Sequence, residues 1–86
     1  MLLRTPFGVV MMIKELDSVV LTVDLPEHGL ARGDIGTVVL LHGAEGYEVE
    51  FVALDGETLA VVSLSTNQVR AIGPREIAQA RSIEAA

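Results

Sequence analysis

The sequence predicts an all-β fold, a small barrel of five short strands followed by a short C-terminal helix. Two observations predict it. The apolar residues come in short runs rich in Val, Leu and Ile, and Gly, Pro, Asn and Asp separate these runs. In the clearest run, Tyr47, Val49 and Phe51 alternate with Glu48 and Glu50, which is the period of a strand with one buried face. At 86 residues the chain has room for one domain.

Composition limits both the core and the partners. Half of the residues are hydrophobic but only 3% are aromatic, so the core must be mainly aliphatic. The absence of cysteine excludes disulfides and thiolate chemistry and permits a reducing compartment, so the cytoplasm is the default expectation. The net charge is −6, and residues 12–72 hold three basic against ten acidic residues. Such a surface disfavours nucleic acids and anionic membranes, and no apolar run is long enough to span a bilayer.

The N-terminal segment, residues 1–11, is apolar but interrupted by Pro6 and Gly8, and no small-residue cleavage site follows it. It therefore does not fit a signal peptide. We interpret it as an upstream start or an extra edge strand, and we place the barrel at residues 12–72.

The first two strands flank a glycine-containing loop. The β-branched run from Ser18 to Val23 suits a strand. Residues 24–34 then form a polar loop that ends in a turn at Gly33-Asp34. Ile35 to Leu41 is the second strand, in which Gly36 indicates a bulge or a close backbone crossing.

The second half continues as hairpins and ends in a tail. After the loop from His42 to Gly46 and the third strand, Asp55-Gly56-Glu57 is a turn into a fourth strand, Thr58 to Leu64. Residues 65–68 have the composition of a single helical turn, and residues 69–72 form a brief last strand. In residues 73–86, Pro74 fits a first helical position and Ile77, Ala80 and Ile83 share a helical face, so the tail is predicted to be a marginal helix.

Five short strands, a long first loop, tight hairpins and one turn before the last strand are typical of an SH3-like barrel. A five-stranded oligonucleotide-binding type of barrel is the alternative, but its strands usually need more residues than this chain offers.

Residues 12–72 resemble the family of small bacterial proteins called domain of unknown function 4926. The resemblance is carried by the segments Ile13-Lys-Glu-Leu-Asp17, Asp24-Leu-Pro-Glu-His-Gly-Leu30, Gly33-Asp-Ile-Gly-Thr-Val38, Tyr47-Glu-Val-Glu-Phe51 and Asp55-Gly-Glu57. Since that family has no settled activity, the resemblance implies only a small accessory role, for example neutralising or scaffolding a cognate partner.

The barrel region is also similar to the SH3-like domain of nitrile hydratase β subunits. Leu25-Pro26, Gly33 to Val38, His42-Gly43 and Tyr47 to Phe51 carry this second resemblance. It implies an accessory subunit or maturation factor of a metalloenzyme. Because the metal-holding cysteines of that family belong to its other subunit and this chain has none, the resemblance carries over no catalysis.

Candidate contact residues cluster in the 24–34 loop. Asp24, Glu27, His28 and Arg32 are predicted to contact a protein partner, and the partner surface is expected to be basic. His28 lies near two carboxylates that favour its protonated form, although a solvated loop histidine bonded to a carboxylate is the simpler interpretation. Glu48 and Glu50 point from one strand to the same side and add to the negative field.

Other chemistry is not indicated. Asp24, His28 and His42 lack the spacing of a metal site, so we predict no metal and no cofactor. Ser63 has no positioned base nearby in the sequence, and an enzyme is not expected. Capture of proline-rich peptides is disfavoured because Tyr47 and Phe51 belong to the buried face. The prediction is a non-enzymatic protein-binding module, and the apolar ends of the chain make a homo-oligomer plausible.

Overall fold

The computed structural model describes residues 12–83 and shows a single antiparallel sheet. Its strands are β1 (Ser18–Leu21), β2 (Ile35–Leu41), β3 (Gly46–Val52), β4 (Thr58–Ser65) and β5 (Val69–Ala71), with one 3-10 turn, η2 (Pro26–His28). The all-β prediction is confirmed, and the five strands lie where the sequence placed them to within two residues at each end. The predicted extension, residues 1–11, lies outside the described residues.

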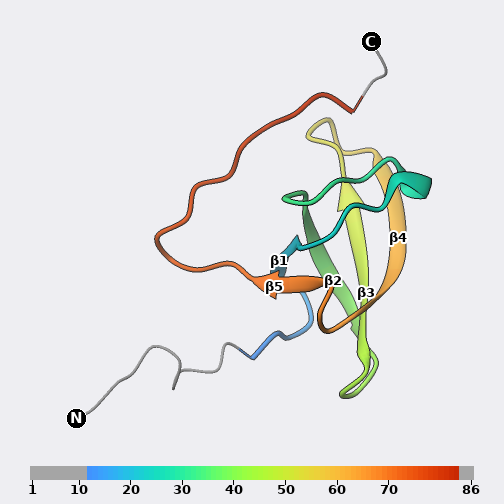
Figure 1. The fold of residues 1–86 in the computed structure, drawn as a ribbon, viewed down its shortest axis with the longest axis vertical. Helices are drawn as coiled ribbons and strands as arrows, with labels where there is room; N and C mark the ends of the chain where they lie inside the picture. The colour runs from blue at the N-terminus through green and yellow to red at the C-terminus, as the bar shows by residue number, and fades with distance from the viewer. Residues whose placement is uncertain (1–11, 84–86) are drawn as a thin grey trace.

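The sheet has the strand order β4-β3-β2-β1-β5 (Figure 1). Strands β1 to β4 follow one another as hairpins, and β5 returns to pair with the free side of β1 through Val19↔Ala71 and Leu21↔Val69. Within residues 12–83 no ladder joins β4 to β5, so these two strands form the edges. The structure therefore shows five strands in one sheet, and closure into a barrel stays a prediction.

The core lies on one face of this sheet and is aliphatic apart from Phe51. On β3 the expected alternation is present: Val49 and Phe51 are buried, while Glu48 and Glu50 lie on the opposite face. Among the described residues no polar or charged side chain is buried. The buried cluster is formed by Val19, Leu21, Leu25, Leu30, Val38, Val49, Phe51, Val62, Leu64 and Val69.

Gly36 was predicted to mark a bulge or a close backbone crossing, and the structure shows instead a close approach of side chains to its backbone. A Cβ built on Gly36 would lie 2.6 Å from Cγ1 of Val49 and 2.8 Å from Cε1 of Phe51. The bulges lie elsewhere. Val39 has no partner between Val38↔Val49 and Leu40↔Glu48, and a second register shift occurs where β3 ends against β4. Because a bulge increases local twist, these two positions help to coil the sheet around its core.

The predicted C-terminal helix is wrong. Residues 76–83 are extended and exposed, and no helix forms between Gly73 and Ile83. A helix this short is marginal in water unless its apolar face packs on something, and Ile77 is 91% exposed. An extended chain also rises more than twice as far per residue as a helix, roughly 3.3 Å against 1.5 Å, so the tail spans the distance from the Arg70–Glu76 pair to the Arg81–Asp34 pair.

The helical turn predicted for residues 65–68 is also wrong. These residues form a hydrogen-bonded turn in which the N–H of Gln68 donates to the carbonyl of Ser65 at 3.0 Å. The side-chain oxygen of Gln68 accepts from the N–H of Ser65 at 2.9 Å and so fixes the turn locally. In the part of the chain that the structure describes, no helix is long and apolar enough to cross a membrane.

Candidate functional site

The 24–34 loop is held in one conformation by its own backbone. Leu25 and Leu30 are buried and pair with each other, with N–H to O distances of 2.9 and 3.1 Å. Between them, η2 turns the chain through Pro26, and Gly29 ends the turn at φ 70°, a left-handed conformation that glycine adopts without strain. The two leucines thus anchor a loop whose intervening side chains face outward.

Two carboxylates fix the second half of this loop. The Asp24 carboxylate accepts the N–H of Arg32 at 2.8 Å, and the Asp34 carboxylate accepts the N–H of Ala31 at 2.8 Å. Asp24 was predicted to contact a partner, but the structure gives it a local role in shaping the loop. One of its oxygens is committed to that role.

Glu27, His28 and Arg32 are the predicted residues that the loop presents to solvent. All three are exposed, and none of their side chains makes a hydrogen bond or ion pair to another residue within 12–83. The expected bond from the His28 ring to a neighbouring carboxylate is not formed. These three side chains are therefore available for an external contact.

Asp34 binds an arginine from the tail, a contact that no local sequence pattern predicts. Nε of Arg81 lies 2.7 Å from Oδ1 of Asp34, a second guanidinium nitrogen lies 2.6 Å from Oδ2, and that same nitrogen lies 3.0 Å from the carbonyl of Gly29. The hydrogen bonds from Arg81 hold the pKa of the Asp34 carboxyl below its usual value, against a smaller opposing effect of burial. The same pair raises the pKa of Arg81.

Glu48 and Glu50 lie on the outer face of β3, and neighbouring side chains hold both of them. Glu48 Oε2 accepts from the Ser63 hydroxyl and lies 2.8 Å from Nε2 of His42, and Glu50 accepts from the Thr58 hydroxyl at 2.7 Å. The hydrogen bond from Ser63, followed by that from His42, lowers the pKa of Glu48. Cross-strand polar pairing of this kind fixes both carboxylates on the sheet.

The cluster of Ser63, Glu48 and His42 does not have the geometry of a nucleophilic site. The histidine does not reach the serine hydroxyl, and the base that does reach it is the Glu48 carboxylate, whose lowered pKa makes it a weak base. Among the described residues, no group of three or more His, Cys, Asp or Glu side chains is placed to hold a metal ion.

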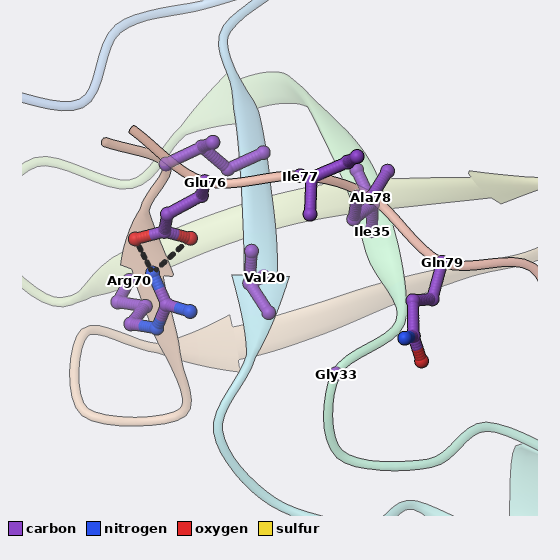
Figure 2. Close-up of a pocket in the computed structure, with 9 residues that line it drawn as sticks. Val20, Gly33, Ile35, Arg70, Glu76, Ile77, Ala78 and Gln79 are labelled. Atoms are coloured by element: carbon purple, nitrogen blue, oxygen red, sulfur yellow. Dashed lines mark hydrogen bonds and ion pairs between the residues drawn. The ribbon is translucent and has the colours of Figure 1, made fainter. Parts of the chain in front are cut away.

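Two pockets lie between the tail and the sheet. Near the start of the tail, a guanidinium nitrogen of Arg70 bonds both carboxylate oxygens of Glu76 at 2.9 and 3.0 Å (Figure 2). Next to this pair, a pocket of about 420 Å³ separates Ile77 and Ala78 of the tail from Val20 and Ile35 of the sheet. A second, larger pocket of about 740 Å³ lies further along, between residues 78–83 and the end of β3.

A comparison with family models places the strands and the loop in one known family. The model described as Domain of unknown function (DUF4926) matches residues 15–71. This span includes all five strands and the 24–34 loop, and it ends before the tail. No curated protein matches the chain, and no solved structure matches it. The similarity to nitrile hydratase β subunits therefore stays a prediction.

Proposed function

The chain belongs to the DUF4926 family, whose description names no activity. From the surface of the chain we propose that it is a non-enzymatic protein-binding module. In this proposal the 24–34 loop contacts a cognate protein with a basic surface, so that the module neutralises or scaffolds that protein. The order of the five strands supports an SH3-like arrangement, in which loops between strands serve as binding surfaces.

One observation carries the proposal: the main chain of the loop is held in one conformation, while the side chains of Glu27, His28 and Arg32 make no bond to another described residue. Backbone pairing of Leu25 with Leu30 and the Asp24 carboxylate fix the main chain. The side chains of Glu27 and His28, both in η2, make no hydrogen bond or ion pair to another described residue. A preordered loop loses little conformational entropy when it binds, so more of the contact energy appears as affinity.

The charge of the module supports a basic partner. With a net charge of −6, the surface attracts cationic proteins at long range and speeds their encounter with the loop. Glu48 and Glu50 contribute to this field, although their bonds to neighbouring side chains leave them less free than Glu27 to form new contacts.

The proposal is tested by capture and charge reversal. The full chain is crosslinked in cells of its source, captured proteins are identified, and affinity is measured for the purified pair. Glu27→Lys should weaken binding by about ten-fold or more, since it replaces an attraction with a repulsion at the contact. The matched control is Glu57→Lys, which changes the net charge equally at the exposed turn between β3 and β4. Absence of a partner, or equal effects of both variants, would contradict a contact at the loop.

The same capture distinguishes the accessory role expected from the nitrile-hydratase-like motifs. That role predicts a cysteine-bearing catalytic chain as the partner. A captured protein that is not a cysteine-bearing catalytic chain would be consistent with a general binding role and would exclude the accessory role in a metalloenzyme.

A further inference from the structure

Two ion pairs attach the tail to the rest of the fold. The Arg70–Glu76 ion pair fixes its start, and the bonds of Arg81 to Asp34 and Gly29 fix its far end. All residues from Pro74 to Ile83 are exposed, and none belongs to the buried core cluster. Figure 1 shows this segment as an arc that leaves β5 and passes outside the sheet. A segment held this way can leave without disrupting the core.

The site that holds Arg81 is already formed by the rest of the fold. The Asp34 carboxylate is oriented by the N–H of Ala31, and the Gly29 carbonyl is fixed at the left-handed end of η2. Together they accept from two nitrogens of one guanidinium, a planar arrangement that matches arginine and not lysine. We call Asp34 and the Gly29 carbonyl the arginine seat.

An apolar floor lies beside the arginine seat, and the tail leaves it partly uncovered. Ile35, Val52, Leu54 and Leu59 line the 740 Å³ pocket beneath residues 78–83. Leu54 is 96% exposed and Val52 is 42% exposed even with the tail in place. Of the tail residues that line this pocket, Ala78 and Ala80 have small side chains, and the one large apolar side chain, Ile83, is 46% exposed. A segment with larger apolar side chains would bury more of the floor.

We propose that the arginine seat and its apolar floor bind an extended, arginine-bearing segment of a partner protein, and that residues 76–83 occupy this site in cis as a competitor. The inference rests on the proposed function, because the occupant is part of the basic partner that the loop receives. The bidentate geometry at Asp34 fixes the arginine, and the exposed side chains of Val52 and Leu54 accept apolar neighbours of that arginine.

Charge favours a partner segment over the tail of a second copy. Two copies of this chain each carry a net charge of −6 and repel each other at long range, whereas a basic segment is attracted. The tail also places a carboxylate, that of Glu76, on this acidic surface, where it pairs with Arg70. The cis occupant is thus a weak match for the site, as expected of a segment that must be displaced.

The test uses the full chain and a free peptide with the sequence of Glu76–Ile83, capped at both ends. Binding is followed by NMR chemical shifts, which detect weak association and report folding in the same spectra. Arg81→Ala in the chain releases the cis competitor, so the peptide should bind this variant about three- to ten-fold more tightly than the parent chain. Arg75→Ala is the matched control, because Arg75 is exposed and its side chain bonds to no other described residue. It should leave the peptide affinity unchanged.

Two further arms assign the binding to the arginine seat. The double variant Asp34→Asn with Arg81→Ala should lose most of the peptide affinity, although the amide oxygen can still accept the N–H of Ala31. A peptide with alanine at its arginine position should not bind. Equal affinity of the parent and the Arg81→Ala chains, or equal binding of the arginine-free peptide, would overturn the proposal. A dimer of the parent chain in light scattering that dissociates on Arg81→Ala would also overturn it, because the occupant would then be a second copy.

The peptide experiment is independent of the loop contact. It needs no captured partner, so it can succeed while Glu27→Lys leaves partner binding unchanged, which would sink the proposed function alone. Conversely, a partner that depends on Glu27 but competes with no peptide at the arginine seat would sink this inference alone.

Discussion

Gly36 offers the most direct test of how the core is packed. It lies on β2 opposite the two most buried side chains of β3, and a Cβ at this position would meet Val49 at 2.6 Å and two ring carbons of Phe51 at 2.8 and 2.9 Å. Real Cβ atoms do not approach so closely, so Gly36→Ala must displace β2 or rotate both side chains. Val49 is fully buried and Phe51 nearly so, which leaves neither of them room to move.

The cost of this substitution follows from two opposing effects. Overpacking a filled core typically costs about 1–3 kcal/mol. Replacing a strand glycine with alanine returns about 0.5–1 kcal/mol, because alanine loses less backbone entropy on folding. The difference spans about 0–2.5 kcal/mol. Because both neighbours are tightly buried, we expect a net loss of about 1–2 kcal/mol in the free energy of unfolding, which corresponds to a fall of roughly 4–16 °C in Tm for a domain of this size.

The assay is urea unfolding followed by far-UV circular dichroism, since the chain has no tryptophan for fluorescence. With an m-value of about 1 kcal/mol/M, Gly36→Ala should lower the midpoint by about 1–2 M. Gly73→Ala is the matched control, because its Cβ would meet only the flexible Glu76 carboxylate, at 3.4 Å. It should be neutral or slightly stabilising. If both variants unfold at the same urea concentration, the close contact at Gly36 is refuted.

Three further predictions concern the backbone and two carboxylates. Leu16 is exposed and has a φ of 72°, a left-handed conformation that asparagine tolerates better than leucine. Leu16→Asn should therefore raise the free energy of unfolding by about 0.5–1 kcal/mol in the same urea assay. A lower urea midpoint would show that the Leu16 side chain makes stabilising contacts. The pKa of Asp34 is lower in the folded protein than its ordinary value of 3.8. The ionised carboxylate therefore stabilises the fold above pH 3.8, and this stabilisation is lost as the pH falls through the pKa of the folded state. Asp34→Asn should therefore cost about 1 kcal/mol at pH 7. The difference in Tm between this variant and the parent should shrink as pH falls below 3.8, and a difference that does not shrink on acidification contradicts the ion pair. The hydrogen bond from the Ser63 hydroxyl is the main cause of the lowered pKa of Glu48, so Ser63→Ala should raise that pKa. Carbon-13 NMR of the Glu48 carboxyl measures the titration, and an unchanged titration in the variant would show that Ser63 does not cause the lowering.

The sheet could be predicted because its signals are local. Alternation in residues 47–51 fixes which face of β3 is buried, and the glycine-containing turns fix where strands end. Gly36 was recognised as a special position from its place inside an apolar strand. The bulge at Val39 was not predicted, because it depends on the register between β2 and β3, and a run of consecutive apolar residues does not reveal register.

The tail could not be predicted for a physical reason. Its composition favours a helix, but propensity is a weak effect that tertiary contacts override. The deciding contacts, from Arg81 to Asp34 and Gly29, join residues about fifty positions apart, and no local pattern encodes them. Similarly, the prediction for the loop found the residues that are exposed, Glu27 and His28, but did not show that Asp24 shapes the backbone.

The use of the few basic residues links the tail to the proposed partner. Of the cations described by the structure, Arg70 and Arg81 form ion pairs with Glu76 and Asp34, and both pairs hold the tail. If the tail leaves, the Asp34 carboxylate becomes free while the Arg81 guanidinium moves away with the chain. The surface around the 24–34 loop then becomes more negative by one charge at the point where an arginine fits. Tail release costs the free energy of the Arg81–Asp34 contacts and leaves a carboxylate that attracts a basic partner, so an arginine of the partner must form with Asp34 the contacts that Arg81 loses.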